Sequence, residues 1–195
     1  MSLSVDDRPY FRPAALDSIL TEAAELGFAM SCADRTGSLL ATFAASKPGG
    51  RMVELGTGVG AGAAWLLHGM RHDAHLISVE MDTARQTVAT KHLGHDARVT
   101  FETADADTWL DTYDGPPLAL AYVDCRPGKF HRLDNLLDLL EPGGLYVVDD
   151  LLPQPTWPSD HQPRVDSFLA QLPEHTNLLG TATTWASGLL VGART

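Results

Sequence analysis

From Arg51 onward, short apolar or β-branched runs alternate with stretches whose apolar residues recur at helical spacing. The run LALAYVD at 118–124 is almost wholly apolar, which is typical of a strand buried on both faces of a parallel sheet. The alternation predicts an α/β fold built on a doubly wound, mostly parallel sheet with helices on both faces. Five of the runs have the length of strands: 51–56, 75–80, 99–104, 118–124 and 145–150.

The end of the chain breaks this alternation. Two strand-like runs, 176–184 and 188–195, are joined by Trp185-Ala186-Ser187. So short a link has no room for a crossover helix, so the two strands must pair antiparallel as a hairpin. We therefore expect a seven-stranded sheet with one reversed strand near its end.

Helical patterns fill the intervals between the runs and also precede the first of them. Two early patterns predict a helical N-terminal cap, 1–50, on an α/β core, 51–195, within a single domain of 195 residues. A proline-rich loop, 151–163, precedes the last helix. The predicted helices cover 13–26, 38–46, 61–70, 83–93, 107–109, 129–140 and 165–172.

Composition excludes several classes of protein. The formal net charge of −11 argues against a nucleic-acid partner. No apolar run approaches the roughly 18 residues of a membrane-spanning helix, and residues 1–11 lack the apolar region of a secretory signal. Cys32 and Cys125 are isolated in the sequence, which suggests a reducing compartment. We therefore expect a soluble, cytoplasmic protein with no membrane partner.

The densest chemical signal is VELGTGVG at 53–60, where the first strand runs into its helix. Gly56, Gly58 and Gly60 allow a sharp turn and let a ligand approach the backbone, beside free N–H groups at the start of the helix. Open α/β sheets bind ligands beyond the carboxyl ends of their strands. A tight strand–helix turn without a ligand is the structural alternative.

Acidic residues near this turn favour a nucleoside ligand. Glu80 lies about 20 residues after the last glycine, where an acid can accept both ribose hydroxyls. Asp105, after the third strand, can accept from the exocyclic amine of an adenine. Glu54 is an awkward neighbour for a pyrophosphate and a suitable one for a cationic ligand. The three acids favour S-adenosylmethionine, with NAD as the alternative.

The segments VELGTGVG, ISVEMD, TADAD and a strand ending in Val123-Asp124 resemble the motifs of class I S-adenosylmethionine-dependent methyltransferases. The short chain, its helical N-terminal segment and Val148-Asp149-Asp150 resemble the small O-methyltransferases of the catechol and caffeoyl-CoA type. The resemblance implies that the methionine part lies at the glycine turn, the ribose at Glu80 and the adenine after the third strand. The residues it assigns to the cofactor are Met30, Glu54, Gly56, Gly58, Gly60, Glu80, Met81, Asp105, Ala106 and Asp124.

Three carboxylates stand at the ends of the fourth and fifth strands: Asp124, Asp149 and Asp150. Carboxylate oxygens are ligands that Mg²⁺ prefers. In the O-methyltransferases an aspartate here and an Asp-Asn pair after the next strand bind the metal, so the resemblance implies a Mg²⁺ site. Asp150 stands where asparagine is usual. Acids that only end a strand and cap a turn are the structural alternative.

The segment after the fourth strand departs from the resemblance. Where the family favours Asp-Ala-Asp-Lys followed by a tyrosine, residues 124–130 read DCRPGKF, with the lysine two positions further on. The candidate catalytic residues are Asp124, Lys129 and His131, and His161 is a further candidate base.

A basic cluster follows the fourth strand. Its residues either begin a helix and pair with Asp134 and Asp138 on the next turn, or hold an anionic group of the acceptor. The loop 151–163 contains Trp157 and can form one wall of a pocket for a planar substrate. The cluster comprises Arg126, Lys129, His131 and Arg132.

We therefore expect methyl transfer from S-adenosylmethionine to a hydroxyl oxygen of a small molecule that is aromatic or anionic. An NAD-dependent oxidoreductase and a non-catalytic S-adenosylmethionine-binding protein are alternatives. An RNA methyltransferase is a third, which the charge of −11 disfavours. Phe11 and Phe28 belong either to a homodimer contact or to the core.

Overall fold

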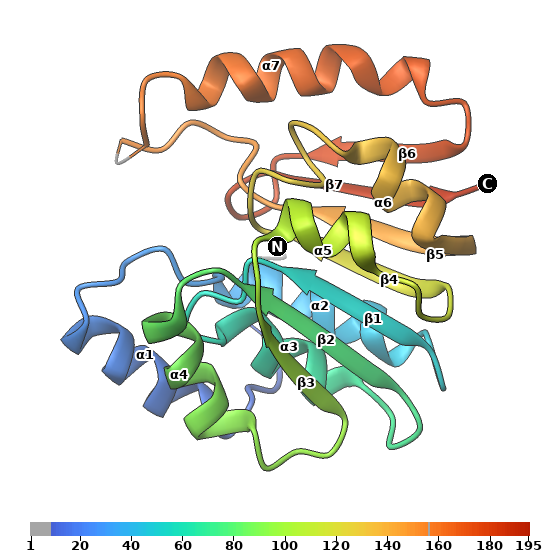
Figure 1. Cartoon of the computed structure of the whole chain (residues 1–195). Coiled ribbons are helices and arrows are strands. Elements are labelled where there is room, and N and C mark those ends of the chain that lie inside the picture. The colour runs from blue at the N-terminus through green and yellow to red at the C-terminus, as the bar shows by residue number, and fades with distance from the viewer. Residues whose placement is uncertain (1–8, 156) are drawn as a thin grey trace, which may run out of the picture.

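The computed structural model describes residues 9–155 and 157–195. Seven strands form one sheet in the order β3-β2-β1-β4-β5-β7-β6 (Figure 1). β7 runs antiparallel to β5 and β6, and every other neighbouring pair is parallel, which confirms the predicted sheet and its closing hairpin. The strands are β1 (Arg51–Leu55), β2 (His75–Glu80), β3 (Val99–Thr103), β4 (Leu118–Val123), β5 (Leu140–Val148), β6 (Leu178–Thr183) and β7 (Leu189–Arg194).

Helices cover both faces of the sheet, as the alternation predicts. Leu40 and Val88, on helices of one face, share an apolar cluster with the sheet, and Leu136 and Phe168 belong to the cluster on the other face. α5 and α6 lie in front of the sheet in Figure 1, and α2 and α3 lie behind it. The helices are α1 (Leu16–Glu25), α2 (Asp34–Ala45), α3 (Ala61–Gly69), α4 (Thr83–Leu93), α5 (Ala106–Thr112), α6 (Leu133–Leu139), α7 (His161–Gln171) and the 3₁₀ turn η1 (Leu172–Glu174).

The most deeply buried strand, β4, lies at the centre of the sheet. All six side chains of β4 are buried, because β1 and β5 flank it and helices cover both of its faces. Burying each Leu or Val side chain contributes about 1.5–3 kcal/mol, so the most apolar strand is most stable at the centre. The edge strand β6 has five exposed residues out of six. This arrangement brings the carboxyl ends of β1, β2, β4 and β5 to one side of the molecule.

The observed helix ends agree with the predicted ones where a capping group in the sequence defines them. α4 begins and ends as predicted: the Asp82 side chain accepts from the backbone N–H groups of Ala84 and Arg85 at its start, and Gly94 is the C-cap at its end. α6 was expected from residue 129 and begins at Leu133. Arg132 adopts a left-handed conformation (φ +61°), which prevents the helix from starting earlier.

Several other boundaries differ from the prediction. α1 begins at Leu16 rather than at 13, and β5 begins at Leu140 rather than at 145. α2 begins at Asp34, four residues before the expected start at 38, and α5 extends over Ala106–Thr112 where only 107–109 were expected. α7 begins at His161, so the last three residues of the predicted loop 151–163 are helical. Boundaries of this kind depend on backbone caps that the hydrophobic pattern does not contain.

The N-terminal region contains α1 and α2, within the predicted cap. Phe11 is 76% exposed and is therefore not a core residue. Cys32 and Cys125 are both free thiols. None of the helices in the described ranges has the length and hydrophobicity needed to cross a bilayer. The expectation about a leader depends largely on residues 1–8, which lie outside the described residues.

Candidate functional site

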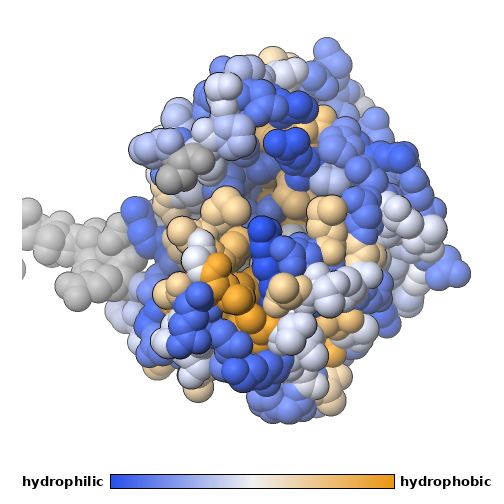
Figure 2. All heavy atoms as spheres, turned by 60° about the vertical axis from the view of Figure 1, so that its left-hand side comes forward, coloured by the Kyte–Doolittle hydropathy of each residue, from blue (hydrophilic) through white to orange (hydrophobic). Residues whose placement is uncertain are grey.

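A cavity of about 260 Å³ lies beyond the carboxyl ends of the parallel strands. Figure 2 shows the molecule from the side of these strand ends, where apolar residues gather at the centre among hydrophilic ones. One part of the cavity wall is the turn between β1 and α3 together with Glu54 and Glu80, which we call the glutamate pair. Another part contains Asp124 and Asp150 from the ends of β4 and β5.

The turn between β1 and α3 requires glycine. Gly56, Gly58 and Gly60 have φ values of +97°, +52° and +97°, a region that side chains with a Cβ rarely adopt. A Cβ on Gly56 would also lie 2.7 Å from the carbonyl oxygen of Asp124. The N–H groups of Gly56 and Thr57 donate to the carbonyl of Val79, which joins the turn to the end of β2. The glycines therefore bring the turn close to β2 and β4.

Glu54 is a buried carboxyl group on the cavity wall. Its side chain is 1% exposed, and the Ser78 hydroxyl donates to its Oε2 at 2.5 Å. Its Oε1 has no hydrogen-bond partner among the described residues. Burial, together with the nearby charge of Glu80, raises the pKa of Glu54 to about 8, although the Ser78 hydrogen bond opposes the rise. An unpartnered buried carboxyl oxygen of this kind is suited to a ligand that donates hydrogen bonds and carries positive charge.

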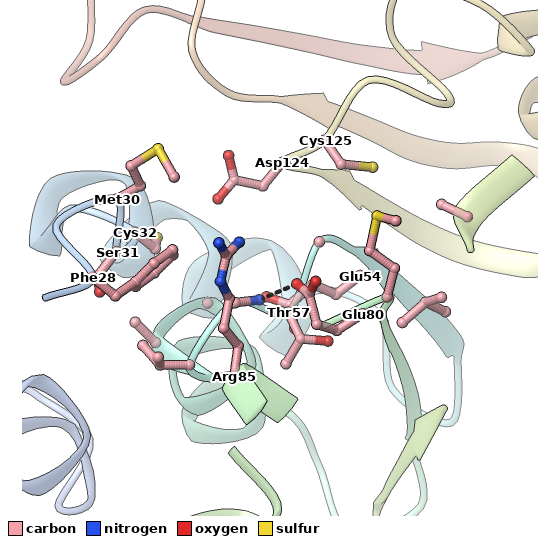
Figure 3. Close-up of a pocket in the computed structure, with 18 of the residues that line it drawn as sticks. Phe28, Met30, Ser31, Cys32, Glu54, Thr57, Glu80, Arg85, Asp124 and Cys125 are labelled. Carbon is pink, nitrogen blue, oxygen red and sulfur yellow. Dashed lines mark hydrogen bonds between the residues drawn. The ribbon is translucent and has the colours of Figure 1, made fainter. Parts of the chain in front are cut away.

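Glu80 ends β2 and faces the same cavity (Figure 3). Its Oε2 accepts from the N–H of Gly58 at 2.8 Å and its Oε1 from the N–H of Asp82 at 2.9 Å. Glu80 is 7% exposed, so these two bonds fix the carboxylate against the glycine turn. Each carboxylate oxygen retains acceptor capacity for a ligand hydroxyl.

The residues after β3 form the far end of the cavity. Asp105 caps α5, and its Oδ1 accepts from the N–H groups of Asp107 and Thr108. Met81 and Ala106 line the cavity beside it, and Met81 is 70% exposed. The predicted acceptor at this position is therefore also a structural helix cap.

The segment between α1 and α2 covers part of the cavity (Figure 3). Met30, predicted to lie there, lines it. Phe28 also lines it, with its ring 3.2 Å from the point that a Cβ on Gly58 would occupy. The guanidinium carbon of Arg85 lies 4.9 Å from the centre of the Phe28 ring, and its Nε is 3.1 Å from Asp82 Oδ2. Sequence reasoning missed Arg85, although its place in the first turn of the helix after Glu80 was a usable signal.

Asp124, Asp149 and Asp150, which we call the acid cluster, each offer a carboxylate oxygen within 4.8 Å of the others. Burial and then the charges of Asp149 and Asp150 hold the pKa of Asp124 well above its usual range. The pKa of Asp150 is raised to about 6, again mainly by burial and by Asp149. Like charges so close are costly without a cation among them, and all three are hard oxygen ligands. The donor set therefore fits a divalent cation such as Mg²⁺.

Lys129 lies beside the acid cluster. It is 3% exposed, and its Nζ donates to the backbone carbonyl of Asp149 at 3.1 Å. Asp149 accepts in turn from the Asp150 N–H at 2.7 Å, from the Tyr122 hydroxyl at 3.1 Å and from the Ser187 hydroxyl. Sequence reasoning missed Ser187, and no spacing rule connects it with Asp149, 38 positions earlier.

His131 and Arg132 of the basic cluster do not form the ion pairs predicted along their own helix. His131 contacts Asp107 at 3.0 Å and Arg132 contacts Asp111 at 2.8 Å, both acids being on α5. The predicted ion pairs with the next helical turn are wrong. No ion pair between the basic cluster and Asp134 or Asp138 occurs in the described ranges, and Asp134 pairs instead with His175. His131 is not among the residues that line the cavity.

Aromatic residues at the end of the proline-rich loop lie beside the acid cluster. His161 Nε2 lies 3.2 Å from the carbonyl oxygen of Asp150. The His161 ring centre is 3.8 Å from that of Trp157 and 5.4 Å from that of Phe130. Burial and the nearby charges of Lys129 and Arg126 lower the pKa of His161, against a raising effect of the Asp150 carbonyl. The three rings form an aromatic group beside Asp150.

Solved structures show the same fold. TomG from Streptomyces achromogenes, an O-methyltransferase in complex with S-adenosylmethionine, superimposes with a TM-score of 0.82, at 22% identity over 93% of this chain and 90% of that one. An O-methyltransferase from Bacillus cereus in complex with S-adenosylhomocysteine superimposes with a TM-score of 0.83, at 17% identity over 95% and 93% of the two chains. At these identities the likeness concerns the fold.

Sequence comparison identifies the family. A protein of Mycolicibacterium vanbaalenii that is assigned as an O-methyltransferase is 29% identical over 117 residues, 57% of this chain and 52% of that protein. The match thus spans about half the length of that relative. Residues 53–151, about half of the chain, match the family described as "Methyltransferase domain". This match disfavours the NAD-dependent alternative. The chain belongs to this methyltransferase family.

Proposed function

We propose that the protein transfers a methyl group from S-adenosylmethionine to a hydroxyl oxygen of a small molecule. The observation that carries this proposal is that one cavity has both the glutamate pair and Asp124 with Asp150 in its walls. A cofactor held by the first wall would present its sulfonium methyl toward the second. Holding two reactants in line contributes several kcal/mol to such a displacement, up to about 7–11 in ideal cases.

On this proposal the cofactor occupies the cavity along the glycine turn. The unpartnered Oε1 of Glu54 would accept from the amine of the methionine part. Glu80, already fixed by Gly58 and Asp82, would accept from the ribose hydroxyls. The cavity residues assigned to the adenine are Met81, Asp105 and Ala106, and Met30 would cover the cofactor.

We propose that the acid cluster holds Mg²⁺. The crowding of three carboxylates and the raised pKa values of Asp124 and Asp150 support a cation at this point. When bound, the ion would lower the pKa of the acceptor hydroxyl. In the transfer the oxygen–carbon bond forms, the carbon–sulfur bond breaks with its electron pair on sulfur, and the hydroxyl proton leaves to a base.

Among the candidate catalytic residues, Asp124 is supported best because it lines the cavity. The buried ammonium of Lys129 would position the backbone at Asp149 and offset the negative charge of the cluster. The imidazole of His131 is 46% exposed and pairs with Asp107. No contact of His131 among the described residues supports a role as a base. We therefore assign the catalytic contribution to Asp124 with the metal, and a supporting one to Lys129.

The aromatic group beside Asp150 supports a planar acceptor. The rings of Phe130, Trp157 and His161 would pack against an aromatic face next to the acid cluster. Arg126 is exposed, and its charge acts on both Asp160 and His161, so it lies near these rings. It would favour an anionic substituent on the acceptor. A hydroxylated aromatic acid combines these two features.

A turnover assay tests the proposal. The protein is incubated with S-adenosylmethionine and a panel of catechols, hydroxybenzoates and hydroxycinnamates, with Mg²⁺ or with a chelator, and S-adenosylhomocysteine is quantified by mass spectrometry. We expect equal amounts of S-adenosylhomocysteine and methylated acceptor, and loss of both with the chelator. Binding of S-adenosylhomocysteine without turnover on any acceptor would favour a non-catalytic cofactor-binding protein, and binding of NAD alone would overturn the proposal.

A further inference from the structure

The turn that joins β6 to β7 contacts the acid cluster, although it lies 38 positions after Asp149 in the sequence. Ser187 donates its hydroxyl to Oδ1 of Asp149, the same oxygen that accepts from the Asp150 N–H. The other oxygen, Oδ2, accepts from the hydroxyl of Tyr122. Asp149 is 3% exposed, so these donors, and not bulk water, orient its carboxylate.

The backbone of the same turn is fixed to the chain that follows Asp150. The N–H of Leu152 donates to the Ser187 carbonyl at 2.7 Å, and the N–H of Leu151 donates to the Gly188 carbonyl at 3.1 Å. Gly188 has φ +87°, and a Cβ there would lie 2.7 Å from Cγ of Leu152. The close approach places Ser187 next to Asp149.

The other side of the turn is fixed to the N-terminal region. The indole Nε1 of Trp185 donates to the carbonyl of Arg35 at 3.0 Å. The Arg35 guanidinium carbon lies 4.3 Å from the centre of the Trp185 ring. Arg35 belongs to α2, which follows the cavity-lining residue Cys32. The turn 184–188 is therefore held on two sides, and its serine has a defined position relative to the acid cluster.

We propose that Ser187 is a positioning residue that orients the carboxylate of Asp149 for a divalent cation in the acid cluster, an inference that rests on the proposed function. Among the described donors to the Asp149 carboxylate, Tyr122 lies on β4 and Asp150 is the next residue of the chain, whereas Ser187 comes from the C-terminal hairpin and so holds the carboxylate independently of the strand end. Groups that orient a metal ligand in this way change metal affinity by about 10- to 100-fold when they are removed.

The test measures Mn²⁺ binding by electron paramagnetic resonance, without any turnover. The variants are Ser187→Ala, which removes the hydroxyl, and Ser187→Thr, which retains it. Thr183→Val is the matched control, because the Thr183 hydroxyl bonds Leu189 and Trp185 within the same hairpin, does not touch the acid cluster and leaves the Ser187 hydroxyl in place. We expect Ser187→Ala to weaken Mn²⁺ binding about tenfold, and the other two variants to bind it as the wild type does.

Calorimetric titration of S-adenosylhomocysteine on the same variants separates this inference from the proposed function. We expect Ser187→Ala to leave that affinity unchanged. Equal Mn²⁺ affinity in the wild type and Ser187→Ala, or no Mn²⁺ binding by the wild type, would overturn the positioning role while cofactor binding stands. Failure to bind S-adenosylhomocysteine with intact Mn²⁺ binding would refute the proposed function and leave the positioning role standing. If Ser187→Ala does not fold, Ser187→Cys, a weaker donor, carries the test, with weakened Mn²⁺ binding expected.

Discussion

The glutamate pair and the acid cluster lie on one cavity, yet they hold their carboxyl groups in different ways. Glu80 is fixed by two backbone N–H donors, and Glu54 keeps one oxygen without a partner at a raised pKa of about 8. In the acid cluster, burial and the charges of Asp149 and Asp150 raise the pKa of Asp124, and burial and the charge of Asp149 raise the pKa of Asp150.

The difference indicates what each side is built to receive. A carboxylate with N–H donors keeps acceptor capacity for neutral hydroxyls, and a lone buried carboxyl oxygen suits an amine. Three carboxylates within 4.8 Å instead repel one another, which favours a cation among them. Changes on one side should therefore alter cofactor binding, and changes on the other should alter metal binding and turnover.

The largest effect is expected for Asp124→Asn. This change removes a charged oxygen from the acid cluster without emptying the space, so methyl transfer should fall about a thousandfold, within the range that proton-transfer groups contribute. Turnover per mole of folded enzyme, followed as S-adenosylhomocysteine formation, measures it. Binding of S-adenosylhomocysteine to the glutamate pair should persist.

Asp150→Asn is the matched control for this prediction. It removes a charge of the same cluster at the position where asparagine is usual in the small O-methyltransferases that the sequence resembles, so turnover should stay close to that of the wild type. If both variants lose activity equally, charge and not the position of Asp124 governs the acid cluster. If neither loses activity, the cluster does not take part in the reaction.

The next largest effect is expected for Glu80→Ala. Two charge-assisted hydrogen bonds to the ribose would be lost, each worth about 1.5–3 kcal/mol, so S-adenosylhomocysteine should bind at least about a hundredfold more weakly. Calorimetric titration measures the affinity. Glu102→Gln, on β3 and bonded to the Trp109 indole, is the control and should bind normally. Unchanged affinity in Glu80→Ala would place the nucleoside elsewhere.

Most of the fold was predictable from the sequence because hydrophobic periodicity depends only on residues that are close together in the chain. The wholly buried run of β4 and the short link before β7 were enough to expect a parallel sheet with a closing hairpin. Strand order was not predictable, since it depends on which buried faces pack together. The predicted start of α6 was wrong because the hydrophobic pattern does not show that the backbone of Arg132 is left-handed.

The site was predictable to the extent that strand ends define it. Glu54, Glu80, Asp124 and Asp150 line one cavity because parallel strands end on the same side. Contacts between segments far apart in the chain were not predictable. Ser187 reaches Asp149 only through the folded hairpin, and the partners of His131 and Arg132 lie on α5 rather than on the next helical turn.

A smaller effect, but a distinctive one, is expected at Glu54. At pH 7 its carboxyl holds a proton, because the pKa is raised to about 8. Binding the ammonium group of S-adenosylhomocysteine should release that proton. Titrations in buffers with different ionisation enthalpies measure the release. Glu54→Gln should bind about tenfold more weakly, through the loss of one charge-assisted bond, and should release no proton from this site.

Glu54 also makes the stability of the ligand-free protein depend on pH. Its pKa is about 8 when folded against 4.5 for a free side chain, so between these values the folded state binds more protons than the unfolded state. The free energy of unfolding should therefore fall as pH rises from about 4.5 to 8. Melting temperatures of the wild type should fall more steeply than those of Glu54→Gln over this range. Parallel curves would mean that Glu54 is charged when folded.

The smallest effect is expected for His131→Ala. The imidazole is 46% exposed and pairs with Asp107, itself 36% exposed, and such surface pairs contribute about 0–1 kcal/mol to folding. It does not line the cavity, so turnover and Mn²⁺ affinity should stay within about twofold of the wild type. Lys129→Met, which removes the buried ammonium next to Asp149, provides the contrast and should alter turnover. A large loss of turnover in His131→Ala, with Mn²⁺ affinity unchanged, would bring this residue into the reaction and extend the catalytic side of the cavity beyond the acid cluster.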